Sequence, residues 1–277
     1  KTDVTNDSDT EATGVSVKST VYNKEGDVVS TQTDDITVAA GKTETISQSV
    51  DVANPKLWSV DSPNLYWVRT EIIQNGKVVD RTDSRFGIRY IATNPNSGFY
   101  LNGVHTKLNG VCEHSDLGSL GMETYQAAVD RRIRTLKKYG VNAIRTSHNP
   151  VSPEFIEACD RLGMLVFEEA FDQWLYSKNS DDYHNYFNKA ADGKTVVFDK
   201  AGNDNTNNDT SYIEVKREDL QSNAERDIKA MVDRDKNAPC IFAWSTGNEI
   251  YDARYKHGEN TLDMLTGWIK EIDTTRP

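Results

Sequence analysis

The chain has 277 residues, with 32 Lys and Arg against 43 Asp and Glu, so its formal net charge is -11. Charged residues make up 27% and hydrophobic residues 36%, a composition typical of folded globular proteins that excludes a disordered or collagen-like chain. The acidic balance argues against a nucleic-acid partner, because clustered Lys and Arg dominate that affinity. No apolar run approaches the roughly 18 residues that a membrane-spanning helix needs, so no membrane partner is expected.

The first part of the chain, residues 15–90, has the period-two pattern of short antiparallel strands. Two of its turns carry hairpin chemistry: Gly26 lies in the first, and Asn75 with Gly76 forms the second. These residue types tolerate the positive φ that tight hairpins require. Regular short strands over this length predict a small sandwich of the immunoglobulin type, although the Cys-Trp-Cys pattern of antibody domains is absent. We place this all-β domain at residues 1–91.

From about residue 101 onward, apolar strands alternate with amphipathic helices, the order that builds a parallel sheet. Strands are expected at 106–111, 142–145, 164–168 and 240–245. Helices are expected at 123–139, between Ser152 as N-cap and Gly163 as terminator, at 217–235 and at about 262–272. A polar excursion at 177–212 leaves too few residues for eight strands. We predict an α/β domain at 92–277, the N-terminal part of a TIM-type (β/α)8 barrel truncated after about four β/α units.

An open, doubly wound sheet is the alternative to the barrel, but the sequence has no GxGxxG or P-loop motif to support nucleotide binding. In a barrel, chemistry lies at the carboxyl ends of the strands. The four predicted ends are all polar. The fourth has an amide beside a carboxylic acid, Asn248 and Glu249, and Trp174 follows the third strand. Such groups suit a sugar, which needs hydrogen bonds, an aromatic face and a proton donor. A solvated barrel rim would also be polar.

Five runs carry a family resemblance: GFYLNGV at 98–104, LNGV at 108–111, RTSHNP at 145–150, EAFDQW at 169–174 and WSTGNE at 244–249. Together and in this order they resemble glycoside hydrolase family 2, and within it the bacterial β-galactosidases. The resemblance implies an immunoglobulin-like sandwich before a catalytic barrel, and a retaining mechanism with two glutamates. No GxSxG or HExxH motif appears, which disfavours an esterase or a metalloprotease.

The resemblance places the general acid/base at Glu249 and the group that binds the sugar 2-hydroxyl at Asn248. The remaining candidate substrate-binding residues lie at the same strand ends: His114, Arg145, His148, Asn149, Glu169 and Trp174. Magnesium or sodium occurs in some members of the family, but their ligands cannot be matched to residues here, so no metal or cofactor is predicted.

A retaining mechanism needs a second carboxylate about 5 Å from the acid/base. The family's nucleophile lies on a later barrel strand, so we expect the parent enzyme to hydrolyse β-galactosides and the 277-residue chain alone to be inactive. Glu169 and Asp172 are poor replacements, since their strand precedes that of Glu249. Ser115 stands where relatives often carry a second His, which leaves the sugar open. β-Glucuronidase, β-mannosidase and a non-catalytic carbohydrate-binding module remain alternatives.

Three further expectations concern the rest of the chain. Cys112, Cys159 and Cys240 lie in apolar stretches without CxxC spacing and are expected to be buried thiols. A partial barrel leaves its last strand unpaired, which invites association of two copies. The chain opens without a recognisable targeting segment, so the compartment stays open.

Overall fold

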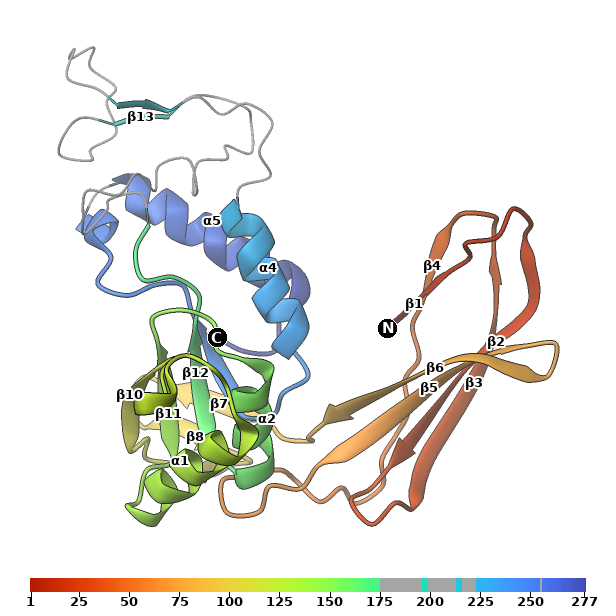
Figure 1. Cartoon of the computed structure of the whole chain (residues 1–277), viewed down its shortest axis with the longest axis horizontal. Helices are drawn as coiled ribbons and strands as arrows, with labels where there is room; N and C mark the ends of the chain where they lie inside the picture. The colour runs from red at the N-terminus through yellow and green to blue at the C-terminus, as the bar shows by residue number, and fades with distance from the viewer. Residues whose placement is uncertain (175–195, 199–212, 216–222, 255) are drawn as a thin grey trace. The chain divides into compact units, whose positions relative to one another are not determined.

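The computed structural model describes residues 1–174, 196–198, 213–215, 223–254 and 256–277. Contacts between residues divide the chain into two compact units, Lys1–Tyr90 and Ile91–Pro277. Figure 1 shows the first unit as strands in red to orange and the second as strands and helices in yellow, green and blue. Among the described helices, none is both long and apolar enough to cross a membrane.

The first unit is built from antiparallel strands in two sheets. Four strands form one sheet in the order β3-β2-β5-β6: β2 (Ala12–Tyr22), β3 (Val28–Val38), β5 (Tyr66–Gln74) and β6 (Lys77–Phe86). The other sheet pairs β1 (Thr2–Thr5) with β4 (Thr43–Ile46). Val4, Val17 and Val38 form a buried cluster with one residue from each of β1, β2 and β3, so the apolar faces of the two sheets share one core.

Both predicted hairpins of the first unit are confirmed. Between β2 and β3, Gly26 has φ 89°, and the Asn23 side chain accepts a hydrogen bond from the Asp27 N–H at 2.8 Å. Between β5 and β6, Asn75 and Gly76 have φ values of 51° and 77°, as a two-residue type I′ turn requires. Strand β1 lies before the predicted strand region and was missed, because only one of its four residues is buried.

The second unit begins with a small antiparallel sheet of β7 (Ile91–Asn94), β8 (Gly98–Leu101) and β9 (Val104–His105). A parallel sheet follows in the order β10-β11-β12-β15: β10 (Gly110–His114), β11 (Ala143–Ser147), β12 (Leu165–Glu169) and β15 (Ile241–Ser245). The helices are α1 (Gln126–Lys138), α2 (Pro153–Leu162), α4 (Asn223–Asp235) and α5 (Lys256–Ile272), with short 3-10 turns η1 (Gly118–Leu120) and η2 (Tyr251–Arg254). Strands β13 (Val196–Phe198) and β14 (Ile213–Val215) pair with each other.

The order of a strand-rich unit followed by four β/α units matches the prediction, but the first parallel strand does not lie at 106–111. The Thr106 N–H donates to the Phe99 carbonyl, which keeps residue 106 with the small antiparallel sheet, and β10 starts only at Gly110. His114 therefore ends the strand instead of following it. Helix α5 starts at Lys256, six residues before its predicted start. Most of the predicted excursion at 177–212, and the first residues of the helix predicted at 217–235, lie outside the described residues.

The predicted boundaries of helix α2 are confirmed, and their chemistry is visible. The Ser152 hydroxyl accepts a hydrogen bond from the Phe155 N–H at 3.3 Å, with Pro153 in the first helical position. Gly163 follows the helix at φ 74°, in the left-handed conformation that favours glycine. The next strand, β12, begins only two residues later.

The expectation of three buried thiols is right for two of them and wrong for Cys112. Cys159 and Cys240 are fully buried, and burial raises the pKa of each thiol well above its ordinary range. Cys112 is exposed. It lies on β10 opposite Arg145 of β11, on the face of the sheet that carries polar side chains instead of the face packed against helices.

A buried ion pair ties the residues after α5 to β15. Asp273 accepts hydrogen bonds from the Trp244 indole at 2.9 Å and from Arg276 at 2.5 Å. Arg276 also donates to the Ile241 carbonyl at 2.8 Å. Burial alone would raise the pKa of Asp273, but the hydrogen bonds donated by Thr275 and Trp244, together with the positive charge of Arg276, lower it to about 2.

This depressed pKa predicts an acid-labile contribution to stability. The folded pKa lies below the ordinary value of 3.8, so the carboxylate stabilises the fold above pH ~4, and this contribution is lost as pH falls towards 2. The shift corresponds to about 2 kcal/mol. Asp273→Asn is therefore expected to lower the free energy of unfolding by about that amount at pH 6 and by much less at pH 2. Urea unfolding at both values measures it; an equal difference at the two pH values would contradict the assignment.

Candidate active site

Alternation along the parallel strands separates two sets of polar side chains. Glu113 of β10 pairs with Arg132 of α1 at 2.9 Å, and Glu168 of β12 with Arg234 of α4 at 3.2 Å. Burial raises the pKa of Glu113, although Arg132 opposes it. Burial and then Asp235 raise the pKa of Glu168 well above its usual range, against the effect of Arg234. These carboxyl groups belong to the layer between strands and helices.

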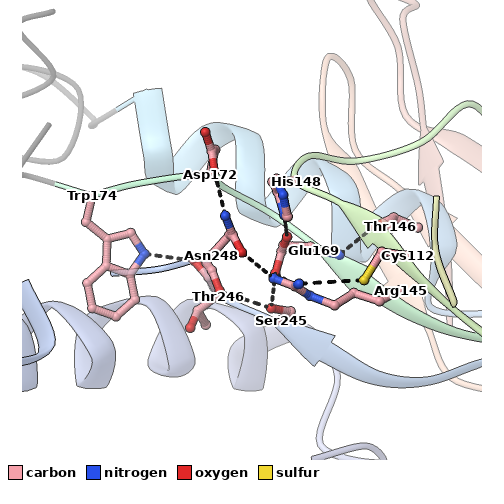
Figure 2. Close-up of polar contacts among 11 residues, drawn as sticks. Cys112, Arg145, Thr146, His148, Glu169, Asp172, Trp174, Ser245, Thr246 and Asn248 are labelled. Atoms are coloured by element: carbon pink, nitrogen blue, oxygen red, sulfur yellow. Dashed lines mark hydrogen bonds and ion pairs between the residues drawn. The ribbon is translucent and has the colours of Figure 1, made fainter. Parts of the chain in front are cut away.

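The residues one position along each strand face the other way and meet around Glu169. Its carboxylate is fully buried and accepts hydrogen bonds from Arg145 Nε at 3.1 Å and Nη2 at 2.5 Å, and from the Ser245 hydroxyl at 2.9 Å. The other carboxylate oxygen lies 2.7 Å from His148 Nδ1. Figure 2 shows Glu169 between Arg145 and His148. Burial disfavours the Arg145 charge, but Glu169 reverses this and raises the pKa of the guanidinium.

Asn248 extends this network beyond the end of β15. Its side-chain oxygen accepts from Arg145 Nη2 at 2.8 Å, and its side-chain nitrogen donates to Asp172 at 2.9 Å. Its backbone N–H donates to the Phe171 carbonyl at 3.1 Å. Asn248 is only 7% exposed. The loop after β12 fixes its backbone, and Arg145 and Asp172 fix its amide (Figure 2).

Trp174 braces the loop that carries Asn248. Its indole N–H donates to the Thr246 carbonyl at 2.8 Å, and its side chain is 3% exposed. A Cβ atom at Gly247 would lie 2.8 Å from Trp174 Nε1 and 2.5 Å from Ile250 Cδ1, so only glycine fits there without a shift. In this arrangement the Trp174 ring packs inside the protein, whereas the sequence pattern favoured an aromatic face open to a sugar.

The two histidines of the site are in contact, and Asn149 lies at its rim. The rings of His114 and His148 are perpendicular, with centroids 5.3 Å apart. Asn149 is exposed, and its amide donates to the Ser115 hydroxyl at 3.5 Å. The ends of β10 and β11 therefore offer imidazole, amide and hydroxyl groups side by side, all of which can bind sugar hydroxyls.

Glu249 follows Asn248 directly and is exposed. Its φ of 45° lies in the left-handed region, which costs a non-glycine residue about 1–2 kcal/mol. Such conformations persist where surrounding contacts impose them, and they gather at functional sites. Here the residues just before Glu249 are held by the hydrogen bond from the Asn248 N–H to the Phe171 carbonyl and by the close packing at Gly247.

A cavity of about 530 Å³ lies beside this network, a size that suits a small ligand. Its walls come from the loops after β11 and β12 and from α4, and include His148, Asn149, Phe171, Asp172, Ile228 and Met231. The structure thus links the seven substrate-binding candidates to one another or to each other's loops, and places Glu249 next to them in the chain.

Cys112 and Ser245 were not among the candidate residues predicted from the sequence, and the sequence did not predict that Asp172 positions Asn248. Cys112 Sγ lies 3.9 Å from Arg145 Nη1, and Ser245 binds Glu169. Alternation within each strand was the available signal. Cys112 lies two residues before His114 on β10, and Ser245 ends β15 as Glu169 ends β12. Alternate strand residues share a face. Within the described ranges, no group of three or more His, Cys, Asp or Glu side chains is placed to hold a metal ion.

Comparison with known proteins matches both units. A family model described as the TIM barrel domain of glycosyl hydrolases family 2 matches residues 93–277, and a second model of glycosyl hydrolases family 2 matches residues 1–89. The chain is 36% identical, over 95% of its length, to the β-galactosidase BoGH2A of Bacteroides ovatus, and spans 27% of that protein.

Solved structures give the same result. A glycosyl hydrolase family 2 member from Bacteroides cellulosilyticus is 35% identical, with a TM-score of 0.79, over 95% of this chain and 30% of its own. A β-glucuronidase from Bacteroides uniformis is 26% identical, with a TM-score of 0.75, over 99% of this chain and 30% of its own. The chain therefore spans about a third or less of the length of these relatives.

Proposed function

Because the chain belongs to glycosyl hydrolase family 2, a family of glycosidases, we propose that a protein carrying it within a complete barrel hydrolyses terminal β-D-galactosides with retention of configuration. One observation supports this most: the amide of Asn248 is held between Arg145 and Asp172, directly before the exposed carboxylic acid of Glu249. An ordered amide and an accessible acid at one strand end suit the sugar ring and the glycosidic oxygen.

In the proposed mechanism Glu249 is the general acid/base. It protonates the glycosidic oxygen as the bond to the leaving group breaks, and then takes a proton from the water that releases the sugar. Asn248 donates its remaining amide N–H to the 2-hydroxyl. His114, His148 and Asn149 supply further hydrogen bonds, and a second carboxylate about 5 Å from Glu249 forms the covalent intermediate.

The charges of the network favour a neutral sugar over a glucuronide. A glucuronide carries a carboxylate that needs a cationic partner, most often an arginine. Among the described residues of the network and its cavity there are two guanidinium groups, and both are engaged. Arg145 binds the Glu169 carboxylate and the Asn248 oxygen. Arg234 lines the cavity and binds Asp235 and Glu168. This supports a galactoside; sequence identity does not choose the sugar, since relatives named β-galactosidase and putative β-glucuronidase are both 36% identical to the chain.

We also propose that the 277-residue chain alone does not turn over substrate. Glu169 is fully buried, and both of its carboxylate oxygens are engaged by Arg145, Ser245 and His148. Asp172 holds Asn248. Neither of these carboxylates is therefore suited to attack an anomeric carbon, so the nucleophile must come from outside this network.

The test compares nitrophenyl β-galactoside, β-glucuronide and β-mannoside, with the 277-residue chain and a longer protein in which the barrel is complete. The longer protein is expected to prefer the galactoside, and Glu249→Gln to lower its activity at least about a hundredfold. Glu259→Gln is the matched control, because Glu259 is an exposed helix residue paired with Lys256.

Each proposal has an outcome that contradicts it. Preference for the glucuronide or mannoside would overturn the choice of sugar. Turnover by the 277-residue chain, abolished by Glu249→Gln, would mean that a second carboxylate works within it. Glycan binding that survives both Glu249→Gln and deletion of residues 91–277, without hydrolysis by the longer protein, would favour a non-catalytic carbohydrate-binding module.

A further inference from the structure

We infer that Asp172 is a positioning residue: with Arg145, it fixes the orientation of the Asn248 amide, the group to which the proposed function gives the sugar 2-hydroxyl. The part of this inference that concerns the sugar rests on the proposed function. The part that concerns the amide rests on contacts within the chain.

The two neighbours of Asn248 hold opposite ends of its amide. Arg145 is a pure donor and lies 2.8 Å from the amide oxygen, whereas Asp172 accepts from the amide nitrogen at 2.9 Å. A half-turn of the amide would bring its N–H groups against the guanidinium and its oxygen against the carboxylate. Both contacts would then be repulsive, so one orientation is strongly preferred.

Both anchors are themselves held in place. Arg145 is fixed by two hydrogen bonds to the buried carboxylate of Glu169. The loop that carries Asp172 is joined to the end of β15 by two backbone hydrogen bonds, from Ala170 N–H to the Ser245 carbonyl at 2.9 Å and from Asn248 N–H to the Phe171 carbonyl at 3.1 Å. The clamp is therefore rigid on both sides.

The orientation has a chemical consequence. The amide nitrogen of Asn248 has two N–H groups, and Asp172 takes one of them. The second N–H remains a donor. Water reaches it poorly, because Asn248 is only 7% exposed. A donor needs an acceptor oxygen, so a substrate that lacks the 2-hydroxyl leaves this N–H without a partner and binds less well.

The first experiment follows the side-chain amide of Asn248 by ¹H–¹⁵N NMR in the 277-residue chain, with assignment from Asn248→Ser. Asp172→Ala is expected to move the signal of the amide proton that Asp172 accepts towards the position of a solvent-exposed asparagine, because this proton loses its charged acceptor. The two protons stay distinct, since the amide C–N bond does not rotate freely. Asp172→Asn, whose side-chain oxygen can still accept, should leave this signal close to its position in the unmodified chain. Asp227→Ala is the control: Asp227 lines the same cavity from α4 but pairs with Arg226. Unchanged Asn248 signals in Asp172→Ala would overturn the inference.

The second experiment measures kcat/KM of the longer protein on nitrophenyl β-galactoside and its 2-deoxy analogue. Asp172→Ala should lose about tenfold on the galactoside, the equivalent of one hydrogen bond of about 1.4 kcal/mol, and little on the 2-deoxy substrate. Asp172→Asn should recover most of the loss. Equal losses on both substrates would overturn the assignment of the Asn248 N–H to the 2-oxygen of the sugar. No turnover by the unmodified protein would refute the proposed function, while the NMR experiment would still decide the role of Asp172.

Discussion

Replacing Glu169 by glutamine is expected to lower the free energy of unfolding of the second unit by about 3 kcal/mol and to disorder the site. The substitution keeps the size of the side chain but removes the charge that, within the described ranges, balances Arg145. Glu169 is fully buried, and the Arg145 side chain is 30% exposed, so the uncompensated charge is partly but not fully reached by water. We therefore place the effect at the lower end of the range for broken buried pairs.

The damage should spread along the hydrogen bonds. A glutamine amide accepts at one end only, so with its oxygen towards Arg145 and Ser245 its nitrogen faces His148 Nδ1, which must then be the acceptor nitrogen of the ring. In either orientation Arg145 faces a neutral amide in place of the carboxylate. Arg145 would then lose its main anchor and release the oxygen of Asn248. A change in the positions of the Asn248 amide signals should accompany the loss of stability.

Urea unfolding followed by circular dichroism measures the change in stability. The matched control is Glu157→Gln, which breaks a 3.6 Å pair with Arg161 on the exposed surface of α2 and should cost no more than about 0.5 kcal/mol. If the two variants unfolded at the same urea concentration, the buried network around Glu169 would not contribute as its contacts suggest.

Much of the fold follows from local patterns in the sequence. The Asn75-Gly76 turn and the Ser152 and Gly163 ends of α2 are set by residues whose chemistry is specific to those positions. The error at the first parallel strand has another origin. The hydrogen bond from Thr106 to Phe99, seven residues earlier, keeps Thr106 with the small antiparallel sheet, and a local pattern does not predict this contact.

The candidate site was predicted less completely, because its order depends on contacts between distant residues. The motifs identified Arg145, Glu169 and Asn248, but the sequence does not show that Glu169 is sealed beneath Arg145 while Glu168, beside it, faces α4. Trp174 illustrates the limit. An aromatic residue at a strand end suits a sugar platform, yet its indole is buried and bonded to Thr246. Residue type alone does not distinguish these two arrangements.

The role of Trp174 as a brace can be tested at Gly247, where we expect the second large effect. In Gly247→Ala the new methyl group would lie 2.5 Å from the tip of Ile250 and 2.8 Å from Trp174 Nε1. The Ile250 tip can rotate away, but the indole is buried and bonded to Thr246, so that hydrogen bond must break or the loop must move. Overpacking of this kind costs about 1–3 kcal/mol.

Movement of the loop would displace the two residues that follow Gly247. Asn248 and Glu249 depend on its path, and Glu249 holds a left-handed φ of 45° that a shifted loop would not impose. We therefore expect Gly247→Ala to lower kcat of the longer protein by about tenfold or more, since small misplacements of catalytic groups cost up to a hundredfold. A loss of stability alone would not lower kcat at temperatures where the variant is still folded.

The indole N–H signal of Trp174, assigned from Trp174→Phe, reports the same event in the 277-residue chain. It should shift and exchange faster with solvent in Gly247→Ala. The matched control is Gly267→Ala on α5, where an added Cβ meets no atom within 4 Å and should stabilise the helix by up to about 1 kcal/mol. An unchanged indole signal together with unchanged kcat would mean that the loop accommodates the methyl group, and that Trp174 does not set the position of Glu249.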